Sequence, residues 1–286
     1  MNKEQLKNDF LGTVFSLTHK TIFQYGILYL LLTAIPLILV VTTWGFLGGV
    51  EIMQTIAPLI GETNPELVDQ GTLALANQLA EIFSRPFGMT AFFGGILLMI
   101  LASCWLLSTM VKINYYRLNG ENYSFWNLLI STLKGDLFKV FSFVLILIGF
   151  SLTFLMLLTL LAKMSLFAAI LSFFFFLFVL AKLILAIPVI VMHEFSSTEG
   201  INYSWALISN KLAIKIMLAG LVFMVATLII SLVVASINAL IGTEGIPFMI
   251  IGILLNLISS LYFNSFLLSG LVTLFCYYEE TVVEEN

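Results

Sequence analysis

Few residues of this chain are of the types that carry out chemistry. His193-Glu194 opens like the HExxH motif of zinc proteases, but the motif needs a second histidine on the same helix face, and Ser197 stands there. No P-loop, nucleophile elbow or dinucleotide fingerprint occurs. Cys104 and Cys276 lie in or beside apolar runs, which does not favour a metal site. We therefore expect no enzyme activity, no catalytic residue, no cofactor and no metal.

Lys182 is the most informative single residue, because it lies inside a long apolar run. It precedes the boundary residue His193 by eleven positions, which places it about 16 Å deep at the helical rise. A lysine near the bilayer midplane costs about 2.5–3.5 kcal/mol on insertion scales. Two interpretations stay open. Either the ammonium faces a polar cavity, an anionic lipid or a carboxylate, or the long side chain snorkels to the surface.

Other residues within apolar runs complete a candidate site for a ligand, a lipid or a polar cavity. Pro188 is predicted to free the backbone carbonyl near Ile184 and to bend its helix. Asparagine at membrane depth is better buried against another helix than exposed to lipid, so we expect interhelical hydrogen bonds. The candidate set is Lys182, Pro188, Asn238, Asn256 and Asn264.

The composition predicts that most side chains of this chain face lipid and not water. Of the 286 residues, 60% are hydrophobic and only 10% are charged, with a mean hydropathy of +1.09. Soluble domains carry about 25% charged residues, and a soluble fold could not hide so much apolar surface. The main partner is therefore the lipid bilayer. No basic stripe favours nucleic acid.

The predicted fold class is all-α: a polytopic integral membrane protein with six transmembrane helices, arranged as three hairpins with short interfacial helices. A span needs about 20 apolar residues, and continuous rather than alternating runs predict helices. We expect a single transmembrane domain over residues 1–286. The predicted spans are 22–47, 87–111, 138–161, 166–192, 213–241 and 246–276, with an external insertion at 48–86.

The basic residues predict the orientation. Nine of the twelve lysines and arginines fall in the N-terminal segment and in the second and fourth connections. An excess of basic residues marks cytoplasmic loops. We expect a multi-pass protein of the bacterial cytoplasmic (inner) membrane with both termini in the cytoplasm. The nine are Lys3, Lys7, Lys20, Lys112, Arg117, Lys134, Lys139, Lys211 and Lys215.

Three stretches that precede a span share a polar and aromatic segment that ends in a lysine, at Lys20, Lys134 and Lys211. They predict three copies of one unit, an interfacial helix followed by a transmembrane hairpin, starting near residues 10, 122 and 200. Aromatic residues at helical spacing predict flat interfacial helices at 123–135 and 201–212. The alternative stays open that any cytoplasmic entry to a span carries lysine.

The first hairpin differs from the others by its long external insertion, 48–86. Asn64-Pro65 predicts a helix start, because asparagine caps and proline fits the first turn. We expect an amphipathic helix over the mouth of the bundle, where a membrane or periplasmic protein partner would bind. Its apolar face is formed by Leu75, Leu79, Ile82 and Phe83.

Two segments carry a resemblance to a known family. The stretch from Ala186 to Glu194, followed by Trp205-Ala206-Leu207-Ile208-Ser209-Asn210-Lys211, resembles a span that ends in Pro-x-aliphatic-aliphatic-x-x-Glu before an interfacial helix. The aromatic-then-charged ending Cys276-Tyr277-Tyr278-Glu279-Glu280 is similar too. The family is the membrane domain associated with glycerophosphoryl diester phosphodiesterases, together with uncharacterised bacterial inner-membrane proteins of similar layout.

The resemblance covers most of the chain from Lys112 onward and implies a six-helix integral membrane domain. It does not imply phosphodiesterase activity, because the catalytic domain of that family is a separate soluble unit for which this chain has no room. The insertion after Gly48 departs from the family pattern and puts a shared external partner in doubt.

Two functions remain in view. We expect a non-enzymatic membrane module that acts as a scaffold or as an accessory, regulatory subunit. The alternative is a transporter or lipid-handling protein with a mid-membrane site around Lys182 and Pro188, since repeat-built bundles with broken helices are characteristic of transporters. No acidic residue lies inside another predicted span to couple ions. An intramembrane enzyme ranks last.

Overall fold

The chain forms helices that suit a membrane. Every element in the described part is a helix, as the sequence predicts. Five helices are long and apolar enough to cross a bilayer, or six if one bent pair counts as a single span. This suits a membrane-embedded protein, and the count of six stays a prediction. The computed structural model describes residues 9–46, 65–85, 88–222, 225, 229 and 246–285.

The chain divides into two compact units, Ile27–Leu106 and a larger one formed by Met1–Gly26 with Leu107–Asn286. Helices α2 (Phe10–Tyr29) and α6 (Gly88–Asn119) contribute to both. The smaller unit also contains a π-helical turn (Leu30–Ala34), α3 (Ile35–Phe46) and α5 (Pro65–Ser84).

Helix α5 confirms the helix predicted in the insertion. Ile82 is buried, and the Phe83 ring lies 5.4 Å from the Phe92 ring of α6. Leu75 is half-buried, and the side chain of Leu79 lies outside the described ones. The position of this helix over the mouth of the bundle stays a prediction, as does the external location of residues 48–86. Residues 48–64 lie outside the described ones.

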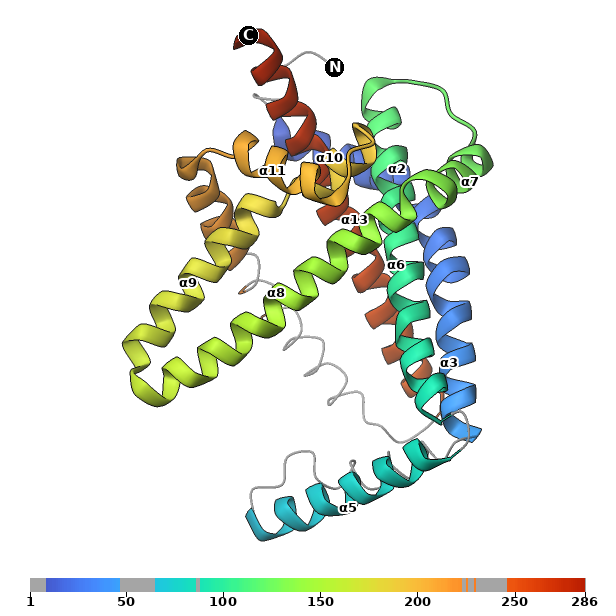
Figure 1. The fold of residues 1–286 in the computed structure, drawn as a ribbon. Coiled ribbons are helices and arrows are strands. Elements are labelled where there is room, and N and C mark those ends of the chain that lie inside the picture. Colours follow the sequence, from blue (N-terminus) through green and yellow to red (C-terminus); the bar gives the residue numbers. More distant parts are fainter. Residues whose placement is uncertain are drawn as a thin grey trace. The chain divides into compact units, whose positions relative to one another are not determined.

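In the larger unit, α8 (Leu137–Met164) and α9 (Leu166–Leu183) form an antiparallel hairpin (Figure 1). The connection is one residue, Ser165, whose hydroxyl oxygen accepts a hydrogen bond from the Ala168 amide at 3.4 Å. Between the helices, the rings of Phe154 and Phe176 stack with centroids 4.4 Å apart. Helix α8 covers the predicted span 138–161, and α9 covers the first two thirds of the predicted span 166–192.

The helix is interrupted one turn before Pro188, where the sequence predicts a freed carbonyl, and the predicted bend stays a prediction. Helix α9 ends at Leu183, two turn residues follow, and α10 (Ala186–Met192) continues the run. The proline has no N–H to donate to the carbonyl four residues earlier, so the regular ladder cannot pass Ile184 unbroken.

Short helices precede the later spans at α7 (Phe125–Gly135) and α11 (Ser197–Leu207). The first matches the predicted helix 123–135, whereas the predicted bounds 201–212 are wrong. A capping box starts α11 earlier: the Ser196 hydroxyl accepts from the Glu199 amide, and the Ser196 amide donates to the Glu199 carboxylate at 2.8 Å. Ile208 is extended, and a new helix, Asn210–Val222, starts at an angle of 98° to α11.

A break between a short helix and the next helix is present at the second and third predicted copies and absent at the first, and the repeat itself stays a prediction. Breaks follow α7 at Asp136 and α11 at Ile208, whereas α2 runs through Lys20 without a break. The stretch around Lys20 has no glycine or asparagine, and the Thr18 and Thr21 hydroxyls donate to carbonyls one turn back in the same helix. The first copy is therefore one continuous helix.

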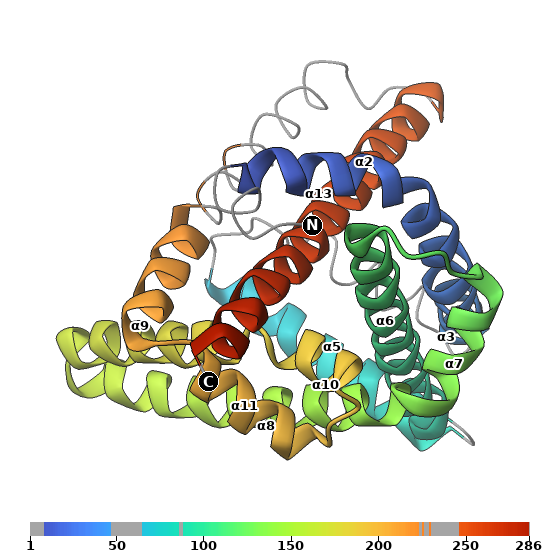
Figure 2. The ribbon, with the colours of Figure 1, turned by 90° about the horizontal axis from the view of Figure 1, so that it is seen from above.

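Helix α13 (Ile246–Glu285) extends nine residues beyond the predicted sixth span and contributes Leu268, Val272 and Phe275 to the buried core. Helix α2 crosses it (Figure 2), with the rings of Phe15 and Phe266 5.0 Å apart. A stripe of small polar residues, Ser265, Ser269 and Thr273, is fully buried. Small residues permit close helix approach in lipid. The predicted span 213–241 lies largely outside the described residues.

Helices α10 and α11 run back against each other, and Gly200 marks their closest approach. A Cβ atom at Gly200 would lie 2.3 Å from Cγ1 of the buried Ile190 and 3.5 Å from the Ala186 carbonyl oxygen. Two helix backbones can come this near only where a side chain is absent. The pair is therefore an αα-hairpin, and α11 does not extend away from the span that precedes it.

We predict that Gly200→Ala destabilises the purified protein by about 1–3 kcal/mol, because overpacking displaces Ile190 or separates the helices. Gly149→Ala is the matched control, since a Cβ atom on this α8 glycine meets nothing within 4 Å. Thermal unfolding in detergent measures both. Equal unfolding midpoints for the two variants would contradict the close contact.

Candidate functional site at the α10–α11 hairpin

Lys182 lies under the end of α11, with 5% of its surface exposed. Its ammonium donates hydrogen bonds to the backbone carbonyl oxygens of Ile208 and, at 3.3 Å, Trp205. The same nitrogen lies 5.4 Å from the centre of the Trp205 ring. The ammonium is therefore in contact with the C-terminal end of a helix of its own chain.

This contact satisfies groups that lipid cannot satisfy. The last carbonyls of a helix lack partners within the helix and carry partial negative charge, so a cation at this end is favourable. In return, the Ser204 hydroxyl donates to the carbonyl of Lys182 at 2.8 Å, beside the interruption before Pro188. The broken end of α9 and the end of α11 thus supply each other's missing partners.

Lys139 of α8 fixes the other end of the hairpin. Its ammonium donates to the Glu194 carbonyl at 2.6 Å, and its own carbonyl accepts from the Ser197 hydroxyl at 2.7 Å. Glu194 adopts a φ of 56°, the left-handed conformation that commonly ends a helix. The Lys182 ammonium therefore holds the C-terminal end of α11, and the backbone carbonyl of Lys139 holds its N-terminal end.

His193, at the end of α10, joins the hairpin to α13. Its Nε2 atom lies 2.9 Å from a carboxylate oxygen of Glu279. The imidazole ring also lies 5.2 Å from the Phe195 ring and 5.8 Å from the Phe275 ring, centre to centre. His193, which begins an incomplete zinc-protease motif, thus connects α10 to α13.

A buried ion pair joins α6 to the start of α8. Lys112 and Asp136 form an ion pair with 2.6 Å between the ammonium and the carboxylate, and only 2% of the Asp136 side chain is exposed. Burial raises the pKa of Asp136, and Lys112 partly opposes that rise. Nearby, the hydroxyls of Thr109 and Thr132 share a buried hydrogen bond of 2.8 Å between α6 and α7.

The interhelical bond predicted for asparagine is absent at Asn264, the one candidate whose side chain the structure describes. Asn264 donates to the Ser260 hydroxyl at 3.2 Å, a bond within α13 and not between helices. Asn238 and the side chain of Asn256 lie outside the described residues. The interhelical role falls instead to Asn114, whose fully buried amide oxygen lies 3.5 Å from the Ser269 hydroxyl of α13. The polar stretch around Asn114, at the end of an apolar run, was the sequence signal for it.

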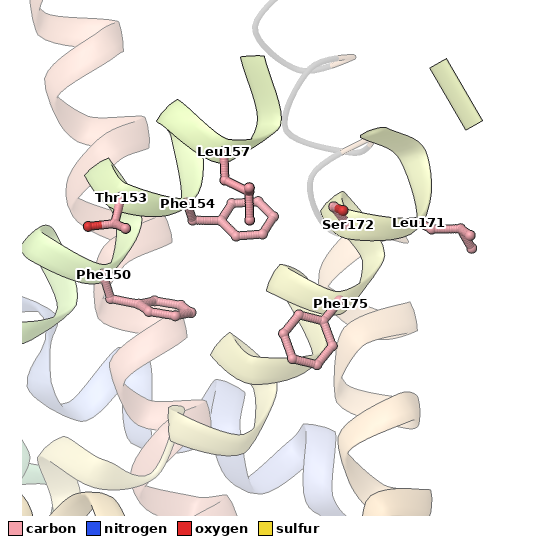
Figure 3. A pocket seen from close by; sticks show the side chains of 7 residues that line it. All are labelled: Phe150, Thr153, Phe154, Leu157, Leu171, Ser172 and Phe175. Carbon is pink, nitrogen blue, oxygen red and sulfur yellow. The ribbon is translucent and has the colours of Figure 1, made fainter. Parts of the chain in front are cut away.

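The α8–α9 hairpin has an apolar groove on each side. One, of about 430 Å³, contains Phe150, Phe154 and Phe175, with Thr153 and Ser172 as its polar lining (Figure 3). The other, of about 440 Å³, is lined by aliphatic residues with Phe154, Phe173 and Phe176, and Ser151 is its one polar residue. Phe154 and Phe176, whose rings stack, border this second groove.

Comparison with protein-family models, with curated proteins and with solved structures finds no match. The resemblance to the phosphodiesterase-associated membrane domain therefore stays a prediction. Within the described ranges, no three His, Cys, Asp or Glu residues lie close enough to hold a metal ion.

We predict that Lys182→Met lowers the stability of the protein by about 2 kcal/mol, because it leaves the carbonyls of α11 without a charged donor. The control is Lys215→Met, which removes an exposed lysine. Thermal unfolding in detergent gives the size of the loss. A Lys182→Met protein as stable as the control would mean that the ammonium does not support α11.

Lys112→Met should cost about 3–5 kcal/mol at neutral pH, because it leaves the Asp136 carboxylate buried without its cation. A folded-state pKa above the unfolded one means that the folded protein binds more protons between the two values, so stability rises as pH falls through that window. Lys112→Met should therefore recover stability in mild acid, and Lys112→Met/Asp136→Asn should not. Unfolding midpoints measured across pH test this. The same acid dependence in both variants would rule out Asp136 as its source.

Proposed function

We propose that the chain is a non-enzymatic integral membrane module that acts as a scaffold or accessory subunit, in the bacterial cytoplasmic membrane with both termini in the cytoplasm. The observation that carries this proposal is the use of Lys182. The ammonium is engaged with carbonyls of its own chain, so it serves the fold and is not offered to a substrate. The transporter or lipid-handling alternative relied on this residue and loses its main support.

The exposed surface favours an assembly role. Helix α8 is apolar enough to span a membrane, and only 6% of its most apolar stretch is buried within the chain. Helices in lipid associate by packing into each other's grooves, and both sides of the α8–α9 hairpin are grooved. We infer that a membrane-spanning helix of a partner protein packs there. A second contact through residues 48–86 stays a prediction.

The basic residues support the orientation. Nine of the twelve lie in segments that this topology places in the cytoplasm. Three of these nine, Lys112, Lys139 and Arg117, make contacts close to the ends of α6 and α8. The proposed topology thus keeps these groups near the headgroups, where charge is least costly.

The test is to purify the tagged chain from its native membrane in nanodiscs and identify stoichiometric proteins by mass spectrometry. We expect one partner, lost when a phenyl ring fills a groove in Ser172→Phe or Ser151→Phe. The control, Leu160→Phe, changes a residue of the same hairpin that is 60% exposed and lines neither groove.

Retention of the partner in both groove variants would reject the hairpin as the contact. If the chain carries no stoichiometric protein and one small molecule or lipid is enriched instead, the scaffold proposal fails. The lipid-handling alternative then replaces it.

A further inference from the structure

A polar pocket of about 250 Å³ lies along the first three turns of α2 and shares no residue with the sites above. Its α2 wall includes Asp9, Thr13, Ser16 and Lys20, which recur at helical spacing on one face. The end of α6 closes the pocket with Arg117. All these residues belong to the larger unit.

The two cations of the pocket gather at one end. The Nε of Arg117 donates to the Tyr123 hydroxyl at 2.8 Å, and this hydroxyl donates to Gln24 at 2.9 Å, one turn beyond Lys20. The single acid, Asp9, lies eleven residues before Lys20, about 16 Å along the helix. Asp9 is also engaged, since it accepts from the Gly12 amide at 3.1 Å. Among the residues that line the pocket, an anion near Lys20 therefore meets two positive charges and no carboxylate nearer than Asp9.

Both cations have donors to spare. Within the described residues, the Lys20 ammonium makes no hydrogen bond or ion pair, and the guanidinium of Arg117 bonds only through Nε, which leaves both Nη groups. The planar fork of an arginine matches two oxygens of a phosphate, and a lysine adds a point charge. Ser16, one turn from Lys20, brings a hydroxyl to the same end.

The pocket lies where a span begins. Lys20 directly precedes the predicted first span, and the next turn carries Phe23, which is 77% exposed. Arg117 lies over the ring of Tyr123, 5.7 Å from its centre, and tyrosine prefers the headgroup level of the bilayer. An apolar side chain on one side of the cations and a tyrosine beside them are the surroundings of a lipid phosphate.

We propose that this pocket binds the headgroup of an anionic phospholipid, with the phosphate between Lys20 and Arg117. The hydroxyls of a glycerol headgroup reach Ser16, and the acyl chains pass Phe23. Phosphatidylglycerol has this chemistry. The site is independent of the proposed scaffold function, because it uses α2 and α6 and not the α8–α9 hairpin.

The experiment uses the full chain, freed of lipid in detergent, and titrates dioleoyl phosphatidylglycerol while recording the thermal unfolding midpoint. A ligand that binds only the folded state raises this midpoint. Each basic group near an anionic lipid strengthens binding. Loss of one basic group should therefore raise the dissociation constant about fivefold, and loss of two about 25-fold. We expect these losses in Lys20→Gln and in Lys20→Gln/Arg117→Gln.

The matched control is Lys134→Gln/Lys211→Gln, which removes two exposed lysines outside the pocket. Lys20→Gln alone keeps the test valid if loss of the Arg117–Tyr123 bond harms folding. A control that loses as much lipid affinity as the double pocket variant would overturn the site. An equal midpoint shift from phosphatidylcholine would overturn the selectivity, and an equal shift from inorganic phosphate would overturn the assignment to a lipid.

Discussion

The structure depends on one constraint: in lipid, a backbone carbonyl or amide that leaves the helical ladder must find its partner inside the protein. Within the described ranges, the ladder of the fourth apolar run is interrupted at Ile184–Leu185 before Pro188, and the chain bends sharply after Leu207. Neither irregular end could face hydrocarbon without a cost of several kcal/mol for each unpaired group. The fold meets the constraint by placing the two ends against each other.

Lys182 makes that solution possible, because only a cation can serve two helix-end carbonyls at once and benefit from their partial charge. Its burial would be prohibitive as a free charge. The same reasoning applies to Lys112, which neutralises the buried Asp136. The half-buried Lys139 likewise donates to a carbonyl at a helix end, that of Glu194. Charge in this protein is sparse, and the buried part of it joins helices that are separate in sequence.

The sequence was sufficient for the helices and insufficient for their contacts. Long apolar runs predicted α8, α9 and α10 within a few residues, because hydrophobic length is a local property. Local chemistry also predicted the interruption at Pro188. The partner of Lys182 was not predictable, since it is a backbone carbonyl 26 residues away, and every residue has one. The predicted start of α11 was wrong although a local signal marks it, namely the capping box formed by Ser196 and Glu199.

The two lysines that hold α11 both precede it in the chain, on α8 and α9. During synthesis the N-terminal segments emerge first, so the Lys182 ammonium and the Lys139 carbonyl, which contact the two ends of α11, have been made with their hairpin before α11 exists. The α8–α9 hairpin can therefore serve as a template on which α11 docks as soon as it is made. The groups that hold α11 are thus synthesised before the helix that they hold.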